Sequence, residues 1–108
     1  MKILAVDYGD SRTGLATCDR TEFLTSPITP QITVKARDKV AARVCEVAKE
    51  IEAELIVIGR GICFGRHAGD AIDEASVEKT YALQEGTSQD SRTIDRLAHL
   101  LESIPTVN

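Results

Sequence analysis

The hydrophobic pattern at the start of the chain predicts three short strands. Residues 2–6 read as a buried strand because residues 3–6 form an uninterrupted apolar run. Residues 13–18 read as a second strand, and the turn-rich GDSR before it predicts an antiparallel pair with a tight return. Residues 28–34 read as a third strand. Pro27 and Pro30 place it at a sheet edge, because proline cannot donate a ladder hydrogen bond.

A helix and a fourth strand follow. Residues 36–52 place apolar side chains at i, i+4, i+7 and i+11 on one helical face: Val40, Val44, Val47 and Ile51. Residues 54–59 (ELIVIG) are apolar nearly throughout, as expected for a strand that is covered on both faces. Three strands, a helix and a strand in this order predict an α/β fold that starts with an antiparallel hairpin.

The second half of the chain has a less regular pattern. Residues 60–70 are rich in glycine and follow no period, and residues 71–83 are helix-prone with a poor apolar stripe. Thr87, with Asp90 three residues later, is a capping-box-like start for a last helix. The apolar face of that helix is formed by Ile94, Leu97, Ala98 and Leu101. Residues 104–107 (IPTV) read as the beginning of another strand.

Composition and charge restrict the setting of the protein. A chain of 108 residues is one domain at most. The 13 basic and 17 acidic residues give a net charge of -4, which argues against a general attraction to nucleic acid but leaves a local basic patch open. Three widely spaced cysteines without a C-x-x-C pattern suggest free thiols in a reducing compartment: Cys18, Cys45 and Cys63. No signal peptide is recognised and no apolar run reaches the ~18 residues of a membrane span, so we expect a cytoplasmic protein without membrane contact.

The first strand leads into a carboxylate that is surrounded by glycines and an arginine. Asp7 at the end of a buried strand could hold Mg²⁺, which commonly bridges a carboxylate to substrate phosphates. Gly9 and Gly14 would let a phosphate approach the backbone, and Arg12 has a forked donor for its oxygens. A plain strand followed by a turn, with Asp7 and Asp10 as turn residues, is the competing interpretation and the commoner one for so short a motif.

The stretch MKILAVDYGDSRTGLATCD also resembles the start of the YqgF-type family. These proteins are described as Holliday-junction resolvases or pre-16S rRNA nucleases of the RNase H-like superfamily. The resemblance rests on six matching residues and continues through residue 59: Asp7, Tyr8, Gly9, Arg12, Gly14 and Asp19. It implies a single RNase H-like domain over residues 1–108, with a three-stranded antiparallel start followed by helix–strand units.

The same resemblance implies a function. It suggests a cytoplasmic, metal-dependent nuclease that uses Mg²⁺ or Mn²⁺ on branched DNA or on the 5′ end of precursor 16S rRNA during ribosome biogenesis. Asp7 would be the catalytic residue and metal ligand, and Gly9, Arg12 and Gly14 would bind the substrate.

The chain departs from the family pattern after Gly59. Residues 60–84 then read as an atypical or inserted segment, the resemblance returns weakly over residues 85–107, and two of three expected carboxylates are missing. An alternative alignment supplies Asp95 as a second carboxylate. Because two-metal hydrolysis needs several carboxylates, a catalytically dead domain that binds nucleic acid or protein is the alternative function. An incomplete sheet edge would also allow a homodimer. An actin-like phosphate site is disfavoured by the short chain.

Further residues were weighed as binding groups. The glycines of RGICFG depart from dinucleotide-loop spacing, which favours an ordinary loop. Cys63 and His67 have no second ligand pair beside them, which argues against zinc. His99 reads as a surface residue. Three basic residues could contact a nucleic-acid backbone, although such residues more often form a solvated face: Arg37, Lys39 and Arg43.

Overall fold

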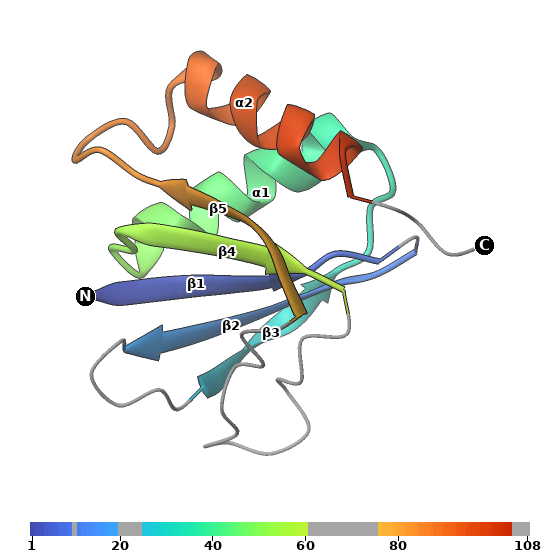
Figure 1. Cartoon of the computed structure of the whole chain (residues 1–108), viewed down its shortest axis with the longest axis horizontal. Helices are drawn as coiled ribbons and strands as arrows, with labels where there is room; N and C mark the ends of the chain where they lie inside the picture. The colour runs from blue at the N-terminus through green and yellow to red at the C-terminus, as the bar shows by residue number, and fades with distance from the viewer. Residues whose placement is uncertain (10, 20–24, 61–75, 105–108) are drawn as a thin grey trace.

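Five strands form one mixed sheet and two helices pack on it, in the part of the chain that the structure describes (Figure 1). The structure is a computed structural model and describes residues 1–9, 11–19, 25–60 and 76–104. In chain order the elements are β1 (Lys2–Asp7), β2 (Thr13–Asp19), β3 (Thr25–Ile32), α1 (Arg37–Glu50), β4 (Leu55–Gly59), β5 (Val77–Ala82) and α2 (Ser91–Glu102).

The first strand lies at the centre of the sheet, whose strand order is β3-β2-β1-β4-β5. β1 pairs antiparallel with β2 and parallel with β4, while β3 and β5 form the two edges and are each antiparallel to their neighbour. The predicted mixed α/β class and antiparallel start are therefore confirmed. The more specific RNase H-like assignment is not confirmed: after β4, the next strand described, β5, runs back antiparallel to it.

Both helices cover one face of the sheet (Figure 1). Successive side chains of a strand point to opposite faces, so Leu4 and Val6 of β1 face the helices while Ile3 and Ala5 face away. A large cluster joins β1, β4, α1 and α2 on the helical face, and a smaller one occupies the other face. Because β1 and β4 are buried on both faces, their sequences read as continuous apolar runs.

The main helix forms as its apolar spacing predicts. Val40, Val44 and Val47 of α1 are each about 1% exposed and pack into the large cluster. α2 adds Leu97 and Leu101, which are fully buried in the same cluster. Each buried aliphatic side chain of this size contributes roughly 1.5–3 kcal/mol relative to exposure, so the contact of the two helices with the sheet is the main stabilising layer.

The segment after residue 70 differs from the prediction. Residues 77–82 were expected to be helical, but they form strand β5 opposite β4. Its side chains alternate between half-buried and exposed, which is a strand period, and ladder hydrogen bonds to β4 outweigh the helix propensity of Glu78, Lys79 and Ala82. The capping-box start is also wrong, because α2 begins after Asp90 without a side-chain cap and the Thr87 hydroxyl donates instead to the carbonyl of Gln84 at 2.7 Å.

Other predictions meet mixed outcomes. The placement of Pro27 and Pro30 on an edge strand is confirmed by β3. Cys18 and Cys45 are buried free thiols, as expected. The RGICFG loop beyond Arg60, the Cys63–His67 pair, and residues 105–107 of the last expected strand lie outside the described residues. Within the described ranges, no helix is long and apolar enough to cross a membrane.

Candidate nucleic-acid interface

The ends of the two parallel strands bring several predicted site residues to one sheet edge. Asp7 lies beside Gly14 on one side and beside Gly59 on the other, because β1 pairs with both β2 and β4 there. We call this edge the carboxyl-end rim, which consists of Asp7, Gly9, Arg12, Gly14, Arg60 and Lys79. Active or binding groups commonly occupy the carboxyl ends of parallel strands.

The carboxylates that metal chemistry would need are not gathered at this rim. Asp19 pairs with Lys2 at the opposite end of the sheet, and Asp95 lies on the exposed side of α2. Asp10 lies outside the described residues. Among the residues that the structure describes, no group of three His, Cys, Asp or Glu side chains could hold a metal ion. Asp7 is half-buried and already interacts with another group, so its role as a metal ligand with Mg²⁺ or Mn²⁺ stays a prediction.

A tight turn after β1 explains why position 9 is glycine. A Cβ atom built on Gly9 would collide with the backbone carbonyl oxygen of Arg12. The two residues can therefore approach closely only because Gly9 has no side chain. Tyr8 anchors the same turn: its side chain is 5% exposed and its N–H donates to the carbonyl of Gly59 at 3.0 Å.

The basic side chains of the rim come from three elements. Arg12 is exposed just before β2, Arg60 is half-buried just after β4, and Lys79 is half-buried on β5 opposite Ile58. Neither Arg12 nor Lys79 makes an ion pair with another described residue. Among the described residues, the rim therefore combines three cationic groups with one partly buried carboxylate.

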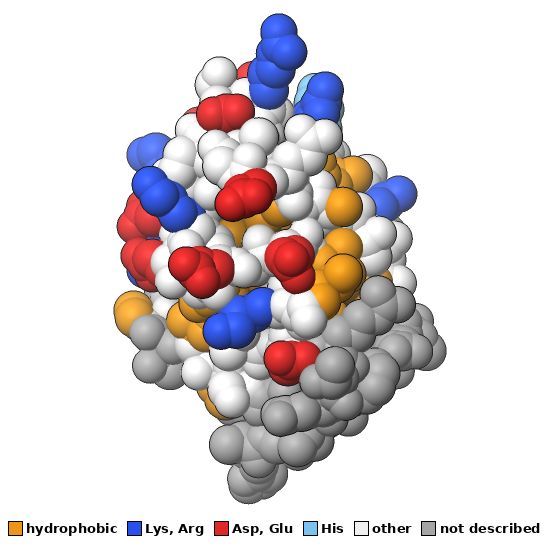
Figure 2. Space-filling model, turned by 90° about the vertical axis from the view of Figure 1, so that its left-hand side faces the viewer, with side chains coloured by type: hydrophobic (Ala, Val, Ile, Leu, Met, Phe, Trp, Pro, Cys, Tyr) orange, Lys and Arg blue, Asp and Glu red, His pale blue; other side chains and the backbone are white. Residues whose placement is uncertain are grey.

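The opposite end of the sheet presents acidic side chains interspersed with basic ones (Figure 2). Acidic side chains spread over the face that contains the amino ends of β1 and β4, and a pocket of about 760 Å³ opens there between the end of α1 and the connection from β5 to α2. Its lining includes three carboxylates (Glu52, Glu54 and Glu85) against Lys49 and the N-terminal ammonium of Met1. The lining of this pocket therefore has a small excess of negative charge.

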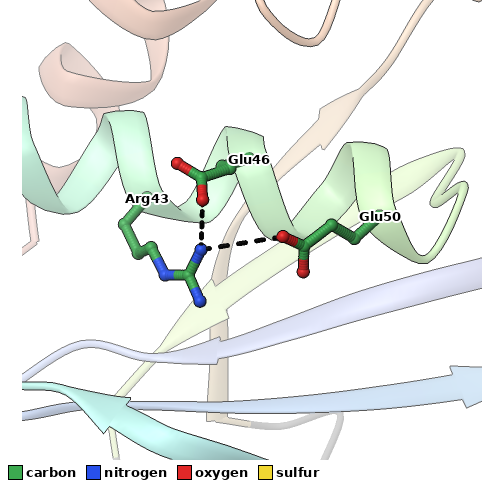
Figure 3. Close-up of polar contacts among 3 residues, drawn as sticks. All are labelled: Arg43, Glu46 and Glu50. Atoms are coloured by element: carbon green, nitrogen blue, oxygen red, sulfur yellow. Dashed lines mark hydrogen bonds and ion pairs between the residues drawn. The ribbon is translucent and has the colours of Figure 1, made fainter.

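One of the basic residues considered from sequence has its charge compensated within its own helix (Figure 3). The Arg43 guanidinium contacts the Glu46 carboxylate one turn away and lies 3.8 Å from that of Glu50. Arg37 and Lys39 are exposed near the start of α1. Arg43 is therefore poorly suited to a phosphate contact, because a phosphate would compete with two carboxylates for it.

Residues 44–90 match the family model of the CAT RNA binding domain. The segment begins inside α1 and contains β4, β5 and the connection to α2. The chain is also similar to the transcription antiterminator LicT of Bacillus subtilis (strain 168), with 45% identity over 40 residues. That alignment covers 37% of this chain and 14% of the antiterminator. The chain thus spans only a small part of this curated relative.

These similarities correct the functional prediction. The YqgF-type resemblance, and with it a metal-dependent nuclease acting on Holliday junctions or precursor rRNA, is wrong: the matched family binds RNA and the relative is an antiterminator. Residues 54–59 were assigned to the nuclease family, yet they lie inside the RNA-binding match. An amphipathic helix followed by an apolar strand is common to many α/β proteins, so this pattern does not separate families.

Sequence reasoning missed two residues of the rim. Arg60 and Lys79 fall in or next to the segment that was interpreted as an insertion. The available signal was the alternation of Val77, Lys79 and Tyr81, which has the period of a strand that returns beside β4. A returning strand would have placed Lys79 near the end of β4 and next to Arg60.

Proposed function

We propose that this chain binds RNA, and that the basic residues of the carboxyl-end rim contact the phosphate backbone. The observation that carries the proposal is the match of residues 44–90 to a family of RNA-binding domains. Of the earlier expectations, the alternative of a nucleic-acid-binding domain fits this match, with RNA in place of branched DNA. The antiterminator shares only 14% of its length with this chain, so we propose RNA binding and not antitermination.

The distribution of charge supports the carboxyl-end rim as the contact. The net charge of -4 disfavours binding over the whole surface. A polyanion would approach the end where Arg60 and Lys79 lie and avoid the end where Glu52, Glu54 and Glu85 line the pocket. Both basic residues belong to the matched segment. Free buried thiols fit the cytoplasmic location expected from the sequence, which is where an RNA partner would be met.

Fluorescence anisotropy with a labelled random 30-nucleotide RNA pool tests this function. We expect binding that weakens as salt rises, with a slope of log K against log[salt] of about -0.7 per neutralised phosphate of a single strand. Double-stranded DNA of the same length serves as the competitor. No binding at about 50 mM salt, or equal competition by RNA and DNA, would contradict the proposal.

Two lysines provide a matched pair of variants. Lys79→Gln removes a rim charge, while Lys49→Gln removes a charge from the acidic end, and both residues lie within the matched segment. We expect Lys79→Gln to weaken binding and make the salt slope shallower, and Lys49→Gln to leave both unchanged. The reverse result would place the interface at the other end of the sheet.

Repeating the titration in EDTA tests the predicted metal at Asp7, since loss of RNA binding on removal of divalent ions would support that metal.

A further inference from the structure

We propose that Arg12 provides a second RNA-phosphate contact from outside the matched segment. This inference rests on the proposed RNA binding. It concerns a turn outside the family match, which begins at residue 44. We call it the Arg12 turn, and its described residues are Tyr8, Gly9, Ser11 and Arg12.

The sheet register places the Arg12 turn beside the matched segment. Asp7 and Gly59 are partners in the parallel ladder, so the chain leaves β1 and β4 at the same edge. The Tyr8 N–H then donates to the Gly59 carbonyl at 3.0 Å, which ties the turn directly to the residue before Arg60. β2 and β4 flank β1, and two strand spacings of about 4.8 Å separate their chains by roughly 10 Å. Arg12 and Arg60 thus border the same rim from either side of β1.

Described residues of the turn make close contacts, while the Arg12 side chain is exposed. Gly9 packs against the Arg12 carbonyl so closely that no Cβ fits between them, and the buried Tyr8 ring anchors the other end. A side chain on a fixed backbone loses less freedom when it binds, which favours it as a contact residue.

Electrostatics distinguishes Arg12 from the better-paired arginine of α1. Arg12 makes no ion pair with another described residue, whereas Arg43 contacts Glu46 and lies close to Glu50. A guanidinium without a carboxylate partner can form a forked pair of hydrogen bonds with a phosphate at no cost in broken ion pairs. Arg12 therefore has the position of a phosphate-binding residue and, among the described residues, no carboxylate partner.

A set of three arginine variants tests the inference in the full chain with the same random 30-nucleotide RNA pool. We expect Arg12→Gln to weaken binding about tenfold at low salt and to make the salt slope shallower by about one. Arg12→Lys keeps the charge and should keep the slope while losing part of the affinity. Arg43→Gln is the matched control and should leave both values as in the wild type.

The possible outcomes separate this inference from the proposed function. If the wild type does not bind RNA, the proposed function fails. If the wild type binds and Arg12→Gln matches Arg43→Gln, the proposed function stands and the Arg12 contact is refuted. If Arg12→Lys loses as much slope as Arg12→Gln, the residue does not act through its charge and the inference is also refuted. Because Arg12 is exposed, we expect all three variants to melt cooperatively as the wild type does.

Discussion

The backbone N–H of Ala53 donates to the carbonyl of Ala48 at 2.9 Å, and this hydrogen bond closes the end of α1. A second bond from the N–H of Glu52 to the carbonyl of Lys49 lies inside it, so the two form the paired closure known as a Schellman motif. The motif requires a residue in the left-handed conformation directly after the last residue of the helix end, and Glu52 takes that conformation with φ of 57°. Glycine normally fills this place, because a Cβ atom is strained there.

We therefore expect Glu52→Gly to stabilise the protein by about 0.5–1 kcal/mol, because relief of the left-handed strain outweighs the extra freedom of the unfolded chain. Chemical denaturation with urea measures the change. Gly86 gives the opposite test, since its φ is 78° and an added Cβ would meet no atom within 4 Å. Gly86→Ala should cost about 1 kcal/mol from backbone strain alone. A destabilised Glu52→Gly would show that its carboxylate matters more than its conformation.

The close contact of Gly9 with the Arg12 carbonyl gives a second prediction. In Gly9→Ala the new methyl group must displace the backbone of the turn, and we expect a loss of about 1–3 kcal/mol in the free energy of unfolding. Ser11→Ala is the control, because Ser11 is exposed in the same turn and should change stability by less than about 0.5 kcal/mol. Equal effects of the two variants would show that the turn adapts without strain.

The elements that were predicted from sequence are those whose own residues decide their structure. The apolar run of β1 predicts a buried strand, and the spacing of Val40, Val44 and Val47 predicts the buried face of α1. Both predictions hold because these apolar side chains are the ones that the fold buries. β5 was missed because its composition favours a helix, and only its hydrogen bonds to β4 select a strand. That pairing involves residues far apart in the chain, which local propensity does not register.

The candidate site was predictable only in part, for the same reason. The motif around Asp7 drew attention to Gly9 and Arg12, and the structure places both at the carboxyl-end rim. Arg60 and Lys79 complete that rim only once β4 and β5 are placed beside β1. The family assignment was wrong because a carboxylate with nearby glycines suits many ligands, so this short motif does not separate families.

The buried thiol of Cys45 gives a pH-dependent prediction. Burial raises the pKa of this thiol from 9.0 to about 11, because the thiolate loses its hydration. Since the folded pKa lies above the unfolded one, the neutral thiol's contribution is complete below pH 9 and is lost as the pH rises from 9 towards 11. Stability should fall over that range by about 2–3 kcal/mol more in the wild type than in Cys45→Ala. Urea titrations at a series of pH values measure the difference. If the free energy of unfolding falls with pH equally in both proteins, the raised pKa of Cys45 is contradicted.

The RNA-binding match also covers only part of the structural unit in which it lies. Ile56 and Ile58 of β4 are fully buried, and their cluster includes Leu4 and Val6 of β1 as well as Leu97 of α2. None of these three partners belongs to residues 44–90. The matched segment alone would retain part of α1 and the β4–β5 pair, and an isolated two-stranded ribbon is marginal in water.

We therefore expect a peptide of residues 44–90 to lack a cooperative thermal transition, whereas the full chain unfolds in a single step. Circular dichroism and amide chemical-shift dispersion measure this difference. The peptide should also bind the random RNA pool more weakly than the full chain, because ordering β4 and β5 would reduce the binding free energy. A peptide that folds alone would show that β1 and α2 are dispensable. In that case RNA binding by the peptide would measure the contribution of Arg60 and Lys79 without Arg12, and comparison with the full chain would give the contribution of Arg12.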